Sequence, residues 1–393
     1  MIQIQKSFST LKLSALVLLG VSIRLALPWV RHNFDVDSWN IVADLLREGK
    51  NVYAETWRHV YGPGLFPICW FSKTVSLMLP FKHPESFHFI FVCFLILADL
   101  GIFFLLRKKV SSLAAILFFL SPISILITSV HSQIDNLAIF FGFGAWLLYE
   151  TPNRNSKTLF FSAALLGLSL IIKHDFILLP LWLLFDPRWT NRKEKMIYLF
   201  MVYALFAGSF VPFCESPESR HGIIKNVFQY SMGTGNALLT HLTQVLIPIG
   251  IIDKFALNSK VVRYIFIGLM LLFGRFVMKR EPQNAFYLYL VGIVLFSPQM
   301  ADQYLAIPVL TCAVFSKNRW LIIYTAVSTF FILGSPFNLY LWPALTGWTF
   351  LTSTYGGGLF WYYNCQIWLL FFLIAYYFQL RSPNCNSPSQ KLC

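Results

Sequence analysis

Residues 86–109, SFHFIFVCFLILADLGIFFLLRKK, form an apolar run that ends in three basic side chains. A helix that crosses a bilayer needs roughly 17 to 25 mostly apolar residues. The cytoplasmic ends of such helices are enriched in Lys and Arg. The stretch therefore predicts a membrane-crossing helix that ends on the cytoplasmic side.

Comparable apolar runs recur along the whole chain. Of its 393 residues, 57% are hydrophobic and only 12% are charged, and the mean hydropathy is +0.62. A soluble globular protein has a much more polar composition. We expect an all-α, polytopic bundle of about 11–13 helices. The runs are 11–30, 86–106, 112–130, 134–150, 158–173, 176–186, 196–213, 261–278, 284–297, 302–315, 319–335 and 359–379.

This pattern leaves no room for a soluble domain, so we expect one transmembrane domain over residues 1–380 and a short tail at 381–393. The N-terminal run is expected to stay as the first helix, because no small-residue cleavage pattern follows it. The seven Cys residues show no metal-ligand spacing and are expected to be packing residues.

Basic residues mark one side of the predicted bundle. They are RKK at 107–109, Arg154 with Lys157, RWTNRKEK at 188–195, KR at 279–280, KNR at 317–319, and Arg381. The positive-inside rule makes this side cytoplasmic and places both termini there. The net charge of +14 then reflects topology and does not indicate nucleic-acid binding.

The opposite, outer side receives the polar segments. These are a long loop at 31–85, the turns 131–136, 173–175 and 297–304, and a second large loop at 214–260. Residues 237–252 are apolar enough for another crossing. We prefer a helix on the outer surface there, because a crossing would move the MKRE sequence at 278–281 outside.

Two carboxylates, Asp35 and Asp37, stand at the start of the first outer loop. A carboxylate at the membrane edge can take a proton from a hydroxyl, which is general-base chemistry. Two alternatives stay open. Asp37 could cap a helix that begins at SWNIVADLL, and a D-x-D pair is also a pattern found among divalent-metal ligands.

Three further polar groups lie at predicted helix ends on the same side. Each could instead be a solvated cap, a snorkelling cation or a solvated face. The groups are His131, Gln133 and Asp135; Lys173, His174 and Asp175; and Arg220, His221 and Lys225. Asp302 is a fourth candidate, with capping of the next helix as its alternative. No GxSxG, HExxH, CxxC or Walker pattern occurs, which argues against common soluble-enzyme chemistry.

These segments resemble motifs of the GT-C integral-membrane glycosyltransferases, in particular bacterial enzymes that use polyprenyl-phosphate mannose. Residues 35–64 are similar to their first outer loop, with D-x-D, an amphipathic helix, G-x-x-x-Y and a Y-G-P turn. HSQIDNLAIFF at 131–141 resembles their (W/H)-G-Q-x-D-x-L turn, with Ser132 in place of Gly. KHDFILLPL at 173–181 and SPQMADQYLAIPVL at 297–310 resemble K-P-Q-x-x-L-L-P and P-x-M-H-E-R-Y-L.

The resemblance implies a GT-C fold with surface helices in the first loop. It implies an inverting hexosyltransferase of the bacterial plasma membrane, which moves a mannose-like hexose from a polyprenyl-phosphate sugar to an acceptor outside the cytoplasm. A first-loop Asp would be the base, with Asp37 favoured by its distance from Gly49 and Asp35 as partner. No divalent metal is expected. Cations near the leaving phosphate would come from Arg58, His59, Lys173, Arg220, His221 and Lys225.

The expected partners are therefore membrane lipids, the lipid-linked sugar and an acceptor, without nucleic acid. Two other functions stay open. A transporter or flippase would place Arg24, Asp99 and Arg275 along a path. An accessory subunit would explain why Ala301, Asp302 and Gln303 replace the His, Glu and Arg common in the fourth motif.

Overall fold

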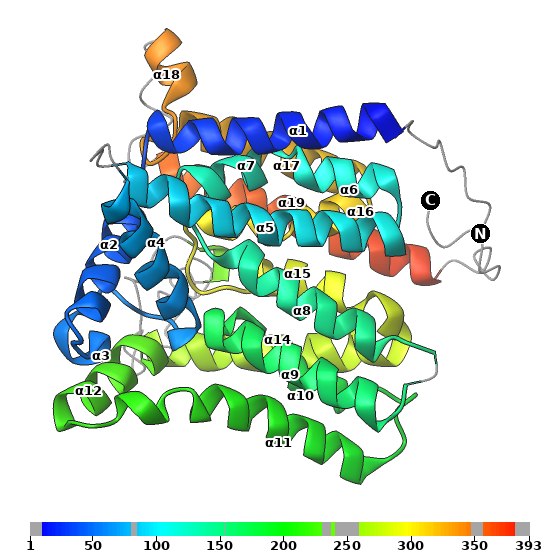
Figure 1. Ribbon diagram of the computed structural model, residues 1–393. Helices are drawn as coiled ribbons and strands as arrows, with labels where there is room; N and C mark the ends of the chain where they lie inside the picture. The colour runs from blue at the N-terminus through cyan, green and yellow to red at the C-terminus, as the bar shows by residue number, and fades with distance from the viewer. Residues whose placement is uncertain are drawn as a thin grey trace, which may run out of the picture.

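The computed structural model describes residues 10–79, 85–152, 154–229, 237–239, 259–346 and 357–381. Every regular element within these ranges is a helix, which confirms the all-α class. Figure 1 shows the long helices running roughly parallel between two ends of the molecule. Most of the segment 237–252, predicted as a surface helix, and the tail after residue 381 lie outside the described residues.

Each predicted apolar run contains a helix, although several helices are much shorter than the run and one run is broken into two helices. The longer ones are α1 (Thr10–Ala26), α5 (Ser86–Lys109), α8 (Asp135–Tyr149), α9 (Ser156–Ile172), α11 (Arg192–Gly208), α14 (Ser259–Arg280), α15 (Ala285–Leu295), α17 (Arg319–Gly334) and α19 (Gly357–Arg381). The others are α2 (Phe34–Arg47), α3 (Val52–Glu55), α4 (Phe66–Met78), α6 (Ser112–Phe119), α7 (Pro122–Ser129), α10 (Leu179–Leu183), α12 (Pro217–Gly222), α16 (Val309–Val314) and α18 (Leu341–Thr346).

Short 3₁₀ turns and one π-helical turn join or extend these helices within the described ranges. The 3₁₀ turns are η1 (Leu27–Trp29), η2 (Pro63–Leu65), η3 (His174–Phe176), η4 (Val211–Phe213), η7 (Pro282–Asn284) and η8 (Asp302–Ala306). The π-helical turn is η5 (Ile223–Phe228).

Four helical segments of the described chain are long and apolar enough to cross a membrane. They are Thr10–Trp29, Ser86–Lys109, Arg192–Phe213 and Trp361–Leu380. The pair α6 and α7, bent by 49°, makes a fifth if it is one broken span. The bend falls at Pro122, because proline has no N–H to continue the hydrogen bonds of α6. Other apolar runs give shorter helices, such as α15 with 11 residues.

The predicted first outer loop is largely helical. It contains α2, α3 and α4, of which the sequence pattern predicted only α2. α2 packs on α4, and α4 packs on α5. Figure 1 shows α2, α3, α4 and α12 gathered at one end of the bundle.

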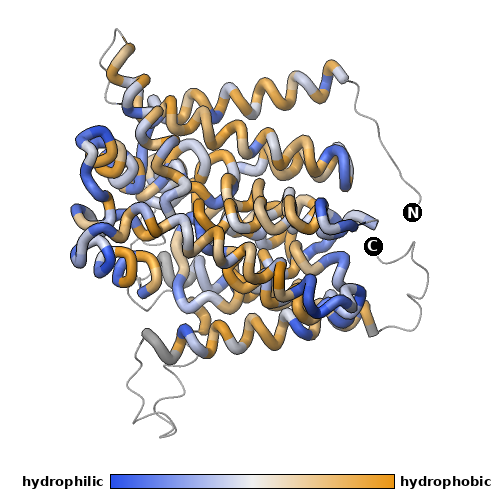
Figure 2. The backbone as a smooth tube through the Cα atoms, turned by 60° about the horizontal axis from the view of Figure 1, so that its bottom comes forward, coloured by the Kyte–Doolittle hydropathy of each residue, from blue (hydrophilic) through white to orange (hydrophobic). Residues whose placement is uncertain are grey.

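The other end of the bundle holds the basic turns. The junctions α5–α6, α8–α9 and α10–α11 lie there, together with the start of α1 and the end of α19 (Figure 1). In Figure 2, hydrophilic residues gather toward the ends of the helices and hydrophobic residues lie along them. The charge pattern predicts this arrangement, in which the basic turns share one end of the bundle and the other polar segments share the opposite end.

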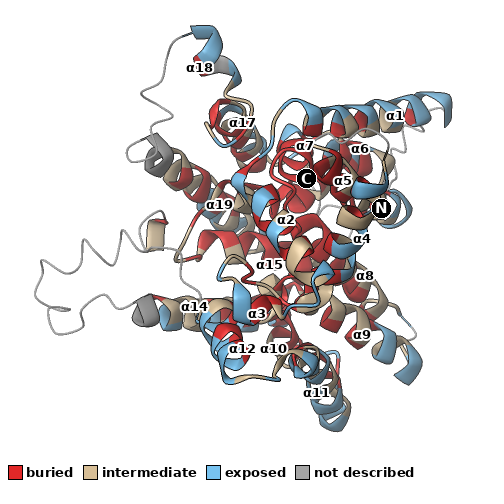
Figure 3. Cartoon of the chain, turned by 60° about the vertical axis from the view of Figure 1, so that its left-hand side comes forward, coloured by how far each residue is buried: buried red, intermediate tan, exposed pale blue. Residues whose placement is uncertain are grey.

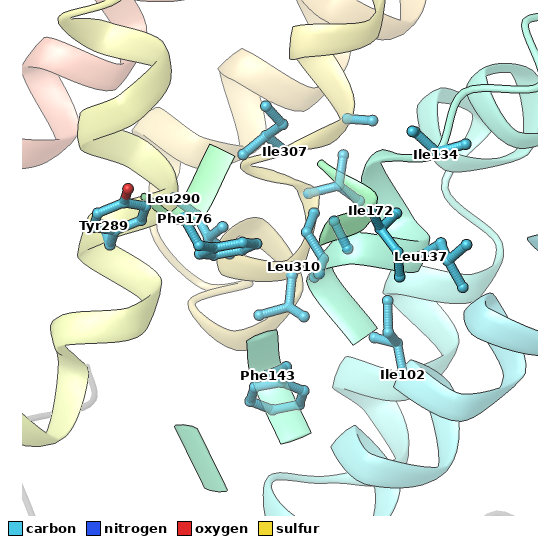
Figure 4. Close-up of a cluster of buried hydrophobic side chains, with 14 of the residues drawn as sticks. Ile102, Ile134, Leu137, Phe143, Ile172, Phe176, Tyr289, Leu290, Ile307 and Leu310 are labelled. Carbon is cyan, nitrogen blue, oxygen red and sulfur yellow. The ribbon is translucent and has the colours of Figure 1, made fainter. Parts of the chain in front are cut away.

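Buried residues gather in the centre of the bundle, and exposed residues lie mostly at its periphery (Figure 3). α8 packs on both α9 and α5. In the close-up of Figure 4, Phe176 lies beside Tyr289, and the two rings are stacked with centroids 5.7 Å apart. The hydroxyl of Tyr289 donates to the carbonyl of Asp175 at 2.7 Å. The core therefore holds the 173–175 turn in place.

Candidate functional site

In the first outer segment, α2 begins at Phe34, one residue before Asp35. Asn33 is the N-cap: its side chain accepts a hydrogen bond from the backbone N–H of Asp35 at 3.1 Å. Asp35 and Asp37 both lie in the first turn, where negative charge complements the helix dipole. The alternative that Asp37 is the cap is therefore wrong, because the helix begins at Phe34.

Asp35 faces the interior of the bundle. Trp39, four residues later on the same helix face, is 2% exposed and donates from its indole N–H to the carbonyl of Ser132 at 3.0 Å. The helix face that carries Trp39 also carries Asp35, and it brings this carboxylate to the turn 131–136. Its Oδ2 accepts a hydrogen bond from the amide of Gln133 at 2.6 Å. The carboxylate keeps 27% of its side chain exposed, enough to meet a substrate.

Asp37 points elsewhere. Residues two apart on a helix do not share a face, and the side chain of Asp37 is 56% exposed with its Oδ1 3.8 Å from Nε2 of His32. The two carboxylates of the D-x-D pair are thus separated. This geometry does not present them to one metal ion, and it favours Asp35 over Asp37 as the group that meets a buried reactant.

The turn 131–136 supplies a histidine between two carboxylates. His131 is buried, with Nδ1 3.9 Å from Asp35 Oδ2 and Nε2 3.8 Å from Asp302 Oδ2. Asn33 places its Nδ2 3.4 Å from the same Nε2. Ser132 allows the tight turn by adopting a φ of 53°, a left-handed conformation. This is the position at which the resembled motif carries glycine.

Asp302, at the start of η8, is held by groups from two other parts of the chain. It accepts hydrogen bonds from Ser335 Oγ at 2.6 Å, Asn338 Nδ2 at 2.9 Å and the hydroxyl of Tyr362 at 2.5 Å. Sequence reasoning missed these three residues, since no local pattern links them to Asp302. They fix the carboxylate that faces His131.

Lys173 closes another side of the cluster. Its Nζ donates to Asp135 Oδ1 at 2.5 Å and lies 3.6 Å from Asp175 Oδ2. Burial would lower the pKa of Lys173, but the charges of Asp135 and Asp175 outweigh burial and raise it well above its ordinary value. Two carboxylates thus already balance this ammonium, so it is a weaker candidate for a phosphate than the sequence suggested.

Aromatic rings lie beside Lys173. Its Nζ is 5.5 Å from the ring centroid of Tyr61 and 5.6 Å from that of Tyr304. Tyr61 comes from the first outer segment, whereas Tyr304 follows Asp302 in η8. The Lys173 ion pair therefore joins the first-loop and 302–304 motifs within the same cluster.

His59 and Arg58 have different environments from the one expected of phosphate ligands. His59 is fully buried, its Nε2 lies 3.1 Å from the carbonyl oxygen of Gly62, and burial lowers its pKa to about 4. It is therefore neutral near pH 7 and supplies no cation. Arg58 stacks on the ring of Phe34, with the guanidinium carbon 3.9 Å from the ring centroid.

The cations of the second outer segment form a separate group. Arg220, His221 and Lys225 are all exposed on α12 and η5. His221 and Lys225 line a surface depression shared with α3 and the residues after it. The structure does not bring these three residues into the Asp35 cluster.

An apolar groove of about 570 Å³ borders the cluster. Most of its lining is apolar, with residues from the segment 174–181, α11, α14 and α15. Its polar lining residues include His174, Asp175, Arg263, Gln299 and Tyr304. Asp175 and Tyr304 also stand next to Lys173, so the groove opens directly beside the ion pair.

The guanidinium of Arg263 also lines this groove, and sequence reasoning did not select this residue. Arg263 lies near the start of α14 and donates to the carbonyls of Phe228 and Gln229 at 3.2 and 3.4 Å. His174 lines the groove as a neutral group, since burial and then the charge of Lys173 lower its pKa to about 4. The sequence places Arg263 at the start of an apolar run, three residues after Lys260.

Several buried polar atoms of the 131–136 turn have no hydrogen-bond partner among the described residues. They are His131 Nδ1, Ser132 Oγ, Gln133 Oε1, Asp135 Oδ2 and Asn136 Oδ1. Buried polar atoms are nearly always paired. The turn that holds Asp35 thus concentrates buried polar groups at one place in the bundle.

Arg24 and Asp99, the charges that a transport path would use, form a closed pair. Both are fully buried, and Arg24 Nε donates to Asp99 Oδ2 at 2.8 Å. Asp99 also accepts from Thr128 at 2.9 Å and Asn136 at 2.7 Å. Arg275, by contrast, is exposed on α14. The three charges do not line a common path in this structure.

The cluster places an oriented carboxylate beside the apolar groove, an arrangement suited to proton transfer. A partly exposed carboxylate, Asp35, is oriented by Gln133, and His131 lies behind it, close to Asp302. Such a carboxylate can accept a proton from a hydroxyl that lies within hydrogen-bonding distance of it. No protein-family model matches the chain, and comparison with curated proteins gives no match either.

Proposed function

We propose that this protein is a membrane glycosyltransferase of the GT-C type. It would move a mannose-like hexose from a polyprenyl-phosphate sugar to an acceptor hydroxyl, with inversion. The observation that supports this best is the meeting of Asp35, His131, Lys173 and Asp302, from four separate segments, beside an apolar groove.

The groove suits the lipid part of the donor. Its walls are mostly apolar side chains such as Phe206 and Phe266, which can bury a prenyl chain. Arg263 stands on the wall and is our candidate for binding the phosphate, because a guanidinium pairs well with phosphate oxygens. The sugar would then lie toward Tyr304 and the polar cluster.

The chemical step is a single displacement with Asp35 as general base. Asp35 takes the proton of the acceptor hydroxyl, and the oxygen forms a bond to the anomeric carbon of the sugar. The bond from that carbon to the phosphate oxygen breaks, and its electron pair leaves with the polyprenyl phosphate. Gln133 orients the carboxylate, and Arg263 stabilises the charge on the phosphate.

The proposal includes no divalent metal. A monophosphate carrier leaves with limited charge, which one guanidinium and nearby polar groups can stabilise. The separation of Asp35 from Asp37 on α2 removes the reason to assign the D-x-D pair to a metal. The remaining partners are membrane lipids and an acceptor whose hydroxyl reaches Asp35.

The test uses the full chain reconstituted in liposomes. We expect transfer of radiolabelled hexose from polyprenyl-phosphate mannose or glucose, and none from the corresponding nucleotide sugars. Arg263→Leu should raise the KM for the lipid donor by about ten- to a hundredfold, the loss of a hydrogen bond to a charged group. Arg275→Leu, on the same helix, should leave the KM unchanged.

Two results would contradict the proposal. One is transfer that uses only nucleotide sugars. The other is movement of a fluorescent lipid-linked sugar between leaflets without any transfer, which would favour a flippase.

A further inference from the structure

A depression of about 530 Å³ lies on the surface formed by α3, the residues that follow it and α12. Its lining includes Glu55, Trp57, Glu218, His221 and Lys225. Trp57 is 65% exposed, an unusual position for the largest apolar side chain. The mechanism proposed above does not use any of these residues.

The walls of this depression are fixed by backbone contacts. A Cβ atom added to Gly222 would lie 1.8 Å from the carbonyl oxygen of Tyr53, so α12 and α3 touch at their main chains. Asn226 adds a hydrogen bond from Nδ2 to the carbonyl of Thr56 at 3.4 Å. Trp57 is therefore presented on a braced segment.

A row of stacked groups leads from the depression to the start of α2. The guanidinium carbon of Arg58 lies 5.9 Å from the ring centroid of Trp57 and 3.9 Å from that of Phe34. Phe34 is 52% exposed and directly precedes Asp35. The row thus extends from the depression to Phe34, the first residue of α2 and the neighbour of Asp35 in the chain.

The chemistry of the lining selects the ligand. Exposed aromatic rings pack against the C–H faces of sugar rings, while the polar groups around them bind hydroxyls. Here two carboxylates accompany one lysine and one histidine. Such a mixture does not favour a phosphate or another anionic headgroup, because binding an anion requires an excess of cations.

We propose that this depression binds a neutral oligosaccharide, as the distal part of the acceptor whose terminal hydroxyl meets Asp35. The inference rests on the proposed function for the role of acceptor. Binding of the sugar itself does not require that function. The competing occupant is the membrane surface, where exposed Trp side chains also gather.

The experiment measures binding without any donor. Full-length protein in detergent is titrated with mannotriose, cellotriose and chitotriose separately, and binding is followed by saturation-transfer NMR. We expect at least one trisaccharide to bind. Trp57→Ala should weaken that binding at least tenfold, whereas Trp70→Ala should not change it. Trp70 is a matched control because it is 47% exposed on α4 and does not line the depression.

Three outcomes would overturn the inference. These are failure of all three sugars to bind, equal effects of Trp57→Ala and Trp70→Ala, and quenching of Trp57 fluorescence by brominated lipids in nanodiscs with no sugar binding. Binding that depends on Trp57 without any transfer would instead contradict the proposed function alone.

Discussion

Ser132 combines two costs in one residue. Its φ of 53° is unfavourable for a residue with a side chain, by about 1 kcal/mol. Its hydroxyl is also buried, with no hydrogen-bond partner in the described part of the chain. The turn nevertheless has to adopt this conformation, because its carbonyl receives Trp39 and the next residue, Gln133, holds Asp35.

We therefore expect Ser132→Gly to raise the free energy of unfolding by about 1 kcal/mol, after the greater flexibility of glycine in the unfolded chain offsets part of the gain. Ser129→Gly is the control, since the Ser129 hydroxyl is likewise buried without a partner among the described residues but lies in α7. Thermal unfolding in detergent measures both. A lower melting temperature for Ser132→Gly than for Ser129→Gly would contradict this explanation.

His59 predicts a dependence of stability on pH. Burial lowers its pKa from 6.5 to about 4, so the unfolded chain binds the proton more readily between these values. Stability from this group is fully present above pH 6.5 and is lost as the pH falls toward 4, by up to about 3 kcal/mol. As the pH is lowered from 6.5 to 4, the melting temperature should fall more steeply for the wild type than for His59→Asn. Equal slopes would show that His59 does not titrate this way.

Sequence reasoning selected Asp35 and Asp37 as candidate general bases, and it ranked Asp37 first by its distance along the chain from Gly49. The ranking depended on whether the helix begins before or after them. With Asn33 as cap, Val36, Trp39 and Val42 are buried on one face. Asp35 shares a side with Trp39 at a spacing of four, which is a signal that the sequence did contain.

At the level of elements, the first outer segment is anchored by a tight approach at its Y-G-P turn. A Cβ atom on Gly62 would lie 2.2 Å from the carbonyl oxygen of Ile171, in α9. The carbonyl of Gly62 is also the partner of His59, and that of Tyr61 accepts from the hydroxyl of Tyr53. This turn thus couples the first loop to the helix that ends next to Lys173.

We expect Gly62→Ala to cost about 1–3 kcal/mol, because backbone must move to make room, and to reduce transfer as Tyr61 is displaced. Gly208→Ala is the control, since a Cβ there meets no atom of the described chain within 4 Å and alanine favours the helix. Melting temperatures and transfer rates of both variants give the test. Wild-type stability and activity for Gly62→Ala would contradict the proposed coupling.

Hydrophobic patterns predicted where the apolar helices lie, but they did not predict the helix α4 or the side-chain contacts between distant helices. Apolar runs correctly predicted α5, α9, α11 and α19, because burial in lipid or core requires continuous apolar sequence. They missed α4, whose sequence FPICWFSKTVSLM mixes polar and apolar residues within a presumed loop. They also could not predict that Ser335, Asn338 and Tyr362 converge on Asp302, since such contacts depend on how distant helices pack.

For the molecule as a whole, the proposed chemistry requires a particular orientation. The Asp35 cluster belongs to the end that carries α2 and α12, and the basic turns belong to the other end (Figure 1). We propose that the basic end faces the cytoplasm, in a bacterial plasma membrane. The cluster would then face outward.

Cysteine labelling tests this orientation. Glu218→Cys on α12 and Lys193→Cys on α11 are both exposed positions at opposite ends. In a background without native cysteines, an impermeant maleimide should label Glu218→Cys in intact spheroplasts, and Lys193→Cys only after permeabilisation. The reverse pattern would place Asp35 on the cytoplasmic side.

The central claim is that Asp35 is the base, and turnover of two matched variants tests it most directly. Asp35→Asn and Asp37→Asn make the same chemical change two residues apart on α2. With polyprenyl-phosphate hexose as donor, we predict a loss of at least about a hundredfold in kcat for Asp35→Asn and less than about twofold for Asp37→Asn, because Asp37 faces solvent. Full turnover by Asp35→Asn, with collapse of Asp37→Asn, would contradict the claim.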